Sequence, residues 1–323
     1  MSFNLFILVI VLAVAFAVIN GFNDAANAIA TLVSTRSLSP LRAVIMASIM
    51  NFVGAATGLA VAYTIGKGIV SPEYIDYGVM IAALSAVIIW GGVATRLGLP
   101  VSISHSFIAG LVGAAIAAAG SVAVVWNTFA KVISSVAIAP ALGFAGGLSL
   151  MIAIMWLLRR RAPLQVEGTF SRLQILSSAF MAYSHGKNDG QMPIGIMAMA
   201  LVIHTGNEFH IPFWMVALSA GAISMGTLFG GWRVIKTVGI RITALRPVHG
   251  FAAMTSAATV VEIASTFGIP VSTTHCVSSS IMGVGATKRL SAVRWGVAGN
   301  IVLAWVLTFP ICGIIGWLLG SIL

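Results

Sequence analysis

The sequence has 323 residues, of which 59% are hydrophobic and only 7% are charged, and its formal net charge is +10. Because a soluble domain is typically about 25% charged, this composition excludes a water-soluble globular protein. A basic excess can indicate nucleic acid, but in so apolar a chain it indicates the lysines and arginines that gather in cytoplasmic loops. We therefore expect a lipid bilayer around the protein and no nucleic-acid partner.

Ten apolar segments follow one another along the chain, and most approach or exceed the roughly 20 residues that a membrane helix needs. They lack the alternation of polar and apolar residues that a membrane β-barrel requires. Because backbone groups in lipid must be satisfied within the segment, these segments predict an all-α polytopic membrane protein. They lie near residues 5–33, 41–65, 78–95, 101–119, 132–158, 173–203, 212–231, 247–267, 270–287 and 296–322.

A polar linker divides the ten segments into two groups of five. It covers residues 159–172 and contains three consecutive arginines. We expect it to separate a first repeat, residues 1–158, from a second repeat, residues 173–323. With an odd number of segments in each half, the second half begins on the opposite side of the membrane from the first.

The basic residues predict the orientation. With the amino terminus outside and the linker in the cytoplasm, outside loops hold only Lys67 and Lys131, and Lys187 falls within a segment. This asymmetry is the bias that sets membrane orientation. The inside loops would hold Arg36, Arg42, Arg96, Arg159, Arg160, Arg161, Arg172, Arg233, Lys236, Arg241, Arg246, Lys288, Arg289 and Arg294.

Four short motifs of the first half recur in the same order in the second half. In opposite orientations they predict inverted-topology repeats, which place a site at their interface near the bilayer midplane. The matched pairs are residues 21–24 with 186–189, Gly54 and Gly58 with Gly226 and Gly230, 98–105 with 268–275, and 140–146 with 310–316. We assign the small-residue faces to internal packing, with a homodimer as the alternative.

The first motif, Asn-Gly-Phe-Asn-Asp-Ala-Ala-Asn at residues 20–27, interrupts an apolar segment, and residues 184–191 repeat its pattern. Asp24 and Asp189 lie deep in their segments, where an ionised group needs a partner or a polar cavity. We expect glycine and proline to let both helices unwind here, so that freed carbonyls and side-chain oxygens bind a hard cation such as Na⁺. The alternative is a polar contact between helices. Recurrence in both halves favours the ion site.

The second motif, Pro-Val-Ser-x-x-His, occurs at residues 100–105 and 270–275. Proline suits the first position of a helix, so free backbone amides and hydroxyls would follow in the first turn. This arrangement favours an oxyanion, because the amide donors and the positive end of the helix dipole act together. The alternative is that the hydroxyls merely cap their helices. We expect His105 and His275 to bond to the neighbouring turn and orient the site.

The remaining charged residues give weaker indications. Lys187 at membrane depth needs a partner, for which Asp24 and Asp189 are candidates. It would neutralise a carboxylate or face the anion. We interpret Glu262 as a buried acid or a pore-lining group, and Arg96 as a residue of an inside loop. No nucleophile, base and orienting group can be assembled, so we expect no enzyme, no cofactor and no metal other than a transported cation.

Taken together, Gly-x-Asn-Asp-x-Ala-Asn at residues 21–27, its shorter echo at 186–189 and the paired Pro-Val-Ser-x-x-His stretches resemble the inorganic phosphate transporter (PiT) family. The resemblance implies a cell-membrane protein that imports phosphate in symport with Na⁺ or H⁺; some relatives are sulfate permeases. By similarity, the cation and substrate-site residues are Asn23, Asp24, Asn27, Asn188 and Asp189, and phosphate is held by Ser102, Ser104, Ser272, Thr273 and Thr274.

The second motif departs from the family pattern. Lys187 stands where the family has a small residue, and Met192 and Pro193 stand where it has Ala-Asn. An ammonium at this position would substitute for a bound Na⁺, which leaves H⁺ coupling open. Phosphate is favoured over sulfate, because it retains a proton that Asp24 or Asp189 can accept. The working hypothesis is alternating access around a midplane site. An uncoupled anion channel or exchanger would not need two buried carboxylates.

Overall fold

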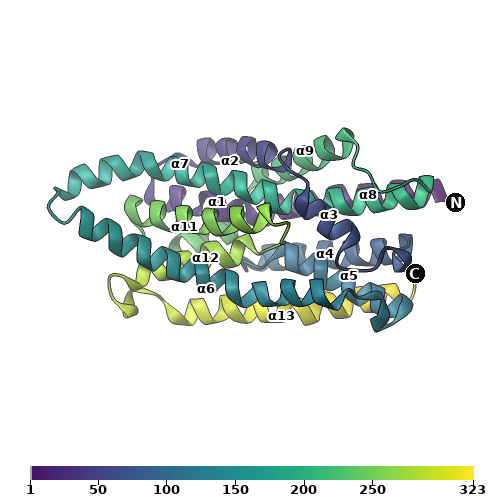
Figure 1. The fold of residues 1–323 in the computed structure, drawn as a ribbon. Coiled ribbons are helices and arrows are strands. Elements are labelled where there is room, and N and C mark those ends of the chain that lie inside the picture. Colours follow the sequence, from purple (N-terminus) through teal and green to yellow (C-terminus); the bar gives the residue numbers. More distant parts are fainter. Residues whose placement is uncertain (1) are drawn as a thin grey trace.

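The computed structural model describes residues 2–323, without the side chains of Ser2 and Pro163. This described chain is helical, with an isolated antiparallel bridge between Val70 and Val124 as its β-structure. Figure 1 shows long helices along one axis, with both termini at the same end. The elements are α1 (Ser2–Thr35), α2 (Pro40–Ala55), α3 (Ala60–Lys67), η1 (Pro72–Tyr74), α4 (Tyr77–Leu97), α5 (Ile103–Ala119), η2 (Ser121–Ala123), α6 (Trp126–Leu157), α7 (Pro163–Asp189), α8 (Gln191–Thr205), α9 (Phe213–Phe229), α10 (Trp232–Lys236), η3 (Thr237–Arg241), α11 (Pro247–Thr266), α12 (Thr273–Ala286), η4 (Leu290–Ala292) and α13 (Trp295–Gly320).

Within the described residues, α1, α4, α6 and α13 are each long and apolar enough to cross a membrane. Two bent pairs pass the same test together: α2 with α3, bent by 65°, and α9 with Trp232–Arg241, bent by 61°. These helices confirm the predicted all-α polytopic membrane protein. That its halves are inverted repeats stays a prediction.

The segment predicted near residues 212–231 continues further than hydropathy indicated. After α9 ends at Gly230, whose φ is +63°, the chain becomes helical again and runs to Arg241. The predicted loop position of Arg233, Lys236 and Arg241 is therefore wrong. All three side chains are exposed, and hydropathy does not separate an exposed basic helix end from a loop because both are polar.

Glycines both bend the helices and let them pack closely. Gly58 lies between α2 and α3 with φ +82°, a backbone region that glycine enters without steric cost. One turn earlier, a Cβ atom on Gly54 would lie 2.0 Å from the carbonyl oxygen of Tyr183 in α7. A Cβ atom on Gly226 would lie 2.0 Å from the carbonyl oxygen of Val18 in α1. These contacts confirm that the small-residue faces serve internal packing.

α1 is a continuous helix through residues 20–27, so the expected unwinding at the first motif is wrong. α7 and α8 are separated by one residue with helical angles, Gly190. Gly21 and Gly186 allow close helix crossings instead. A Cβ atom on Gly21 would lie 2.0 Å from a carbonyl oxygen of α9, and one on Gly186 would lie 2.2 Å from a carbonyl oxygen of α2.

α4 with α5, and α11 with α12, form two helical hairpins whose turns lie inside the bundle. Trp305, well inside α13, donates to the carbonyl oxygen of Pro100 in the first turn at 3.0 Å. Asn188, at the end of α7, donates to the carbonyl oxygen of Ile269 in the second turn at 3.2 Å. Both turns are thus level with the interior of long neighbouring helices.

The position of Arg96 follows from the first hairpin. It lies in the last turn of α4, beside the turn inside the bundle, and its carbonyl oxygen accepts a hydrogen bond from the guanidinium of Arg233. Its predicted place in a loop is therefore wrong, because the segment before it stops at a buried turn.

Two apolar cores flank the middle of α1. One packs the first half of α1 against α3, α4, α5 and α8, and the other packs its last part against α7, α11 and α12. The polar residues Asn20, Asn23 and Asp24 lie between these cores. The α6–α7 connection lies at the end opposite the termini (Figure 1). It is short, because helix α7, with a proline in its first turn, already begins inside the predicted 159–172 linker.

Candidate functional site

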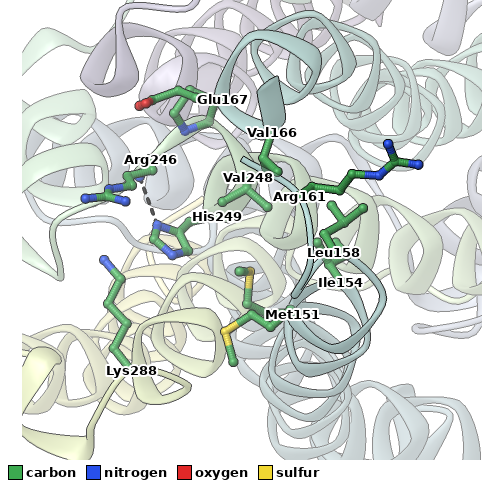
Figure 2. A pocket seen from close by; sticks show the side chains of 12 residues that line it. Met151, Ile154, Leu158, Arg161, Val166, Glu167, Arg246, Val248, His249 and Lys288 are labelled. Carbon is green, nitrogen blue, oxygen red and sulfur yellow. Dashed lines mark hydrogen bonds between the residues drawn. The ribbon is translucent and has the colours of Figure 1, made fainter. Parts of the chain in front are cut away.

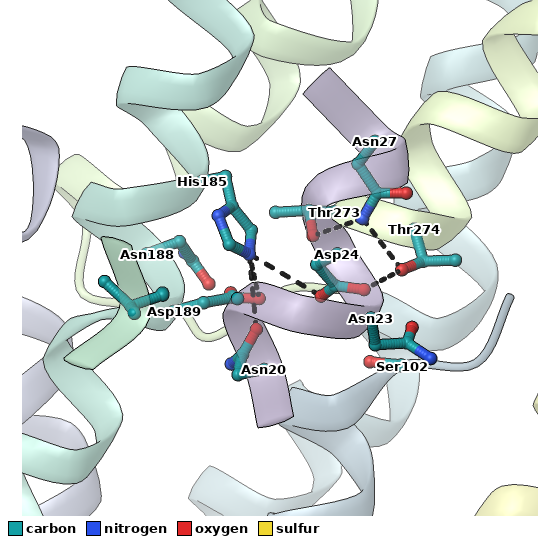
Figure 3. A network of polar contacts seen from close by, with 12 residues as sticks. Asn20, Asn23, Asp24, Asn27, Ser102, His185, Asn188, Asp189, Thr273 and Thr274 are labelled. Atoms are coloured by element: carbon teal, nitrogen blue, oxygen red, sulfur yellow. Dashed lines mark hydrogen bonds and ion pairs between the residues drawn. The ribbon is translucent and has the colours of Figure 1, made fainter. Parts of the chain in front are cut away.

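Two carboxylates from different helices meet at a buried histidine in the middle of the bundle (Figure 3). Nε2 of His185 in α7 lies 3.6 Å from Oδ2 of Asp24 in α1 and 3.4 Å from Oδ2 of Asp189. All three residues are at most 2% exposed. Their ligand atoms lie within 4.8 Å of one another, an arrangement that can hold a cation. The structure thus brings the two predicted aspartates into one site.

His185 is the main site residue that sequence analysis missed. Its Nδ1 lies 2.8 Å from Oδ1 of Asn51, and its Nε2 lies 3.2 Å from Oδ1 of Asn20. Asn51 in turn donates from Nδ2 to Oγ1 of Thr227 at 2.8 Å. The available signal was spacing: His185 stands four residues before Asp189, and residues so spaced share one helix face.

The first turn of α12 is bonded directly to α1. Oγ1 of Thr274 donates to Oδ1 of Asp24 at 2.9 Å. Nδ2 of Asn27 donates to Oγ1 of Thr273 at 3.2 Å and to Oγ1 of Thr274 at 2.9 Å. The predicted hydroxyl turn and the predicted carboxylate motif therefore form one network.

The serines that begin α5 and α12 act as helix caps. Oγ of Ser102 accepts the N–H of His105 at 3.1 Å, and Oγ of Ser272 accepts the N–H of His275 at 3.1 Å. The capping alternative therefore applies to both serines. It does not compete with anion binding, because a hydroxyl that accepts keeps its hydrogen for donation. Oγ of Ser104 is buried, without a hydrogen-bond partner in the described chain.

Other buried polar atoms of the site also lack partners within residues 2–323. They are Oδ1 of Asn23, Oδ1 of Asn27, Nδ2 of Asn20 and, apart from the histidine contact, both carboxylate oxygens of Asp189. Unpaired polar groups are costly in a protein interior. The free oxygens suit a hard cation, which takes oxygen ligands, and the free hydroxyl and amide donors suit an oxyanion.

The predicted asparagines divide into two kinds. Asn23 donates from Nδ2 to Oγ1 of Thr95 at 2.6 Å and keeps its oxygen free, as Asn27 does. Asn188 is bonded on both sides: its amide donates to Oγ of Ser265 at 2.9 Å, and its oxygen accepts the N–H of Val271 at 3.3 Å. In this arrangement Asn188 holds the turn between α11 and α12.

Lys187 does not pair with either aspartate of the site, so the expected partners are wrong. Its ammonium forms an ion pair with Glu262 of α11, which also accepts from Oγ of Ser184 at 3.3 Å. The two charged side chains are 18% and 25% exposed, whereas the aspartates are almost fully buried. Lys187 points to the side of α7 that faces α11, and it neutralises Glu262.

His105 and His275 contact each other instead of the neighbouring turn. Their ring centroids lie 5.2 Å apart in an edge-on arrangement, and His275 stacks on Trp305 with centroids 4.1 Å apart. Their ring nitrogens have no hydrogen-bond partner in the part of the chain that is described. The expected orienting hydrogen bonds are therefore wrong. The rings do bring the starts of α5 and α12 together.

Three comparisons with known proteins agree. The profile described as the phosphate transporter family matches residues 20–316. The chain is 44% identical to a probable low-affinity inorganic phosphate transporter of Rhizobium meliloti (strain 1021), over 98% of this chain and 95% of the relative. It is 43% identical to a protein of the same description from Bacillus subtilis (strain 168), over 96% and 94%. A solved structure described as the sodium-dependent phosphate transporter superposes with a TM-score of 0.88 at 29% identity, over 99% and 98% of the two chains.

Proposed function

Because the chain belongs to the phosphate transporter family, we propose that it imports inorganic phosphate by symport with Na⁺ through alternating access to the buried site. Phosphate is the substrate of this family, and its members are transporters rather than enzymes. The observation that carries the proposal is the meeting of the α5 and α12 turns beside Asp24 and Asp189.

Phosphate would bind between the two helix starts. Backbone amides, the positive helix ends and the hydroxyls of Ser102, Ser104, Ser272 and Thr273 would donate to its oxygens. Thr274 would join them by exchanging its bond to Asp24 for one to phosphate. At neutral pH phosphate keeps a proton, and the free oxygens of Asp189 can accept it. Sulfate has no such proton, so it would meet only repulsion from the carboxylates. This difference supports phosphate as the substrate.

Na⁺ would bind beside the anion, among the free oxygens of Asn23, Asn27 and Asp189, next to Asp24. A cation there offsets the repulsion between the carboxylates and phosphate, so each ion favours binding of the other. The sodium dependence stated for the similar solved structure supports Na⁺ over H⁺. Lys187 does not stand in for this cation, because its charge is matched by Glu262.

Alternating access is supported by the closure of the site. The side chains that would bind both ions are at most 2% exposed, as an occluded step of such a cycle requires. Entry and release then require movement of neighbouring elements. The bends at Gly58 and Gly230, together with the two hairpins, are the segments suited to such movement.

The test is uptake of labelled phosphate into proteoliposomes with imposed Na⁺ or pH gradients, with protein-free liposomes as the control. We expect uptake that follows the inward Na⁺ gradient and is competed by phosphate rather than sulfate. Uptake of sulfate without phosphate would overturn the substrate, and uptake that follows only the pH gradient would replace Na⁺ by H⁺. Flux that ignores both gradients would instead identify an uncoupled channel or exchanger.

A further inference from the structure

A pocket lies beside the α6–α7 connection, away from the buried site, and Figure 2 shows the side chains that line it. Its volume is about 350 Å³, and it is bounded by α6, α7 and both ends of the α11–α12 hairpin. Three cationic side chains, one histidine and one acidic side chain line it: Arg161, Arg246, Lys288, His249 and Glu167.

The opposite wall of this pocket is apolar. It is made chiefly by Met151, Ile154 and Met155 of α6 and by Leu158, which follows α6 directly. The same stretch of α6 carries Trp156, which is 63% exposed and lies under the guanidinium of Arg159 at 5.2 Å. Exposed tryptophan and arginine mark the boundary between lipid and water. The pocket therefore combines a charged rim with an apolar wall at the depth where lipid headgroups lie.

The two basic residues at the rim stand at both ends of the hairpin. Arg246 directly precedes α11, and Lys288 lies two residues beyond the end of α12. Both side chains are exposed, so an anion from outside can reach them. Partial burial and the positive charge of Arg246 lower the pKa of Lys288 below its usual value. An anion between these groups would relieve their repulsion.

We propose that this pocket binds an anionic phospholipid, with its phosphate headgroup at Arg246 and Lys288 and an acyl chain along α6. Free phosphate would use the same basic groups, but it gains nothing from the apolar wall. A basic pocket between membrane helices is the chemistry that recognises anionic headgroups. The bound lipid would tie together the two ends of the hairpin whose buried turn leads into Thr273 and Thr274.

The experiment uses the full chain, purified in a neutral detergent. Its thermal unfolding is followed while phosphatidylglycerol, phosphatidylcholine with the same acyl chains, or inorganic phosphate is titrated in. Bound lipid is counted by native mass spectrometry. The test variant is Arg246→Gln with Lys288→Gln. The matched control, Arg42→Gln with Lys236→Gln, removes the same charge from exposed positions outside the pocket.

We expect phosphatidylglycerol to raise the unfolding temperature of the wild type and of the control, and phosphatidylcholine to have little effect. Each cation removed should weaken binding about five-fold, so the test variant should bind phosphatidylglycerol roughly 25-fold more weakly. Equal binding by the test variant and the control would overturn the proposal.

The titration with inorganic phosphate distinguishes a lipid-binding pocket from a pocket for free phosphate. It should stabilise the wild type and both variants alike through the transport site, and this response also shows that the test variant is folded. A phosphate response lost only in the test variant, without any effect of phosphatidylglycerol, would assign the pocket to free phosphate and overturn the lipid.

Discussion

The first turns of α5 and α12 face the same buried site, but their hydroxyls are used differently. In α12, Thr274 is bonded to Asp24 and Asn27 of α1. In α5, Ser104 has no partner in the described residues, and neither do the oxygens of Asp189, apart from their contact with His185. The two sides of the site are therefore not equivalent. Thr274 on the α12 side is already bonded to α1, whereas Ser104 of α5 and the carboxylate oxygens of Asp189 in α7 are free to bind a ligand.

The largest loss of transport is expected from a change at Asp24, which contacts both the α12 side and the α7 side of the site. Asp24→Asn removes the charge that lies between Thr274 and His185. The attraction between a carboxylate such as that of Asp24 and a cation about 4 Å away is worth about 4 kcal/mol at an effective dielectric constant of 20. Driven phosphate uptake should therefore fall at least about 100-fold in proteoliposomes. Glu208→Gln, in an exposed loop, is the control and should transport normally. Near-normal uptake by Asp24→Asn would remove this carboxylate from the site.

A pair of hydroxyl deletions tests the comparison itself. Ser104→Ala removes no hydrogen bond within the described protein, so its unfolding temperature should be unchanged. Its KM for phosphate should rise about ten-fold, as expected for a lost hydrogen bond to a charged group. Thr274→Ala removes the bond to Asp24, so it should lower the free energy of unfolding by about 2 kcal/mol as well as impair transport. If both variants changed stability equally, the two turns would not differ in the way described.

The smallest effect is expected at the ion pair outside the site. Lys187→Met leaves Glu262 without its partner, and should lower the free energy of unfolding by about 1 kcal/mol, because the pair is partly exposed. The double variant Lys187→Met with Glu262→Met should recover most of this loss. Uptake by the double variant should keep the Na⁺ dependence of the wild type. A changed dependence on Na⁺ or pH would show that Lys187 takes part in coupling.

Hydropathy and motif spacing were sufficient to predict the helical fold and to place Asp24, Asp189 and both hydroxyl turns near one another. These features depend on long apolar runs and on recurrence along the chain, which a sequence displays directly. The family resemblance drawn from the same motifs is confirmed by the comparisons.

Contacts between helices could not be predicted from the sequence, because they depend on how the helices pack against one another. A glycine in a polar motif fits an unwound helix as well as a close crossing, and Gly21 proved to serve a crossing. The partner of Lys187 is on α11, 75 residues away, rather than in its own motif. His185 was passed over because its importance lies in joining Asp24 to Asp189, which are brought together only by folding.

Because α1 is a continuous helix, it determines how far apart its polar side chains lie along the candidate site. Asn20, Asp24 and Asn27 are spaced by four and three residues, and Asn23 precedes Asp24 directly, so all four lie along one side of α1. With a rise of about 1.5 Å per residue, this row of side chains is about 10 Å long. The rigid helix α1 thus fixes the spacing of the side chains that would bind the proposed ions. One alanine inserted after Phe22 would rotate Asn23, Asp24 and Asn27 by about 100° about the helix axis relative to Asn20, so the four side chains would no longer share one side of α1.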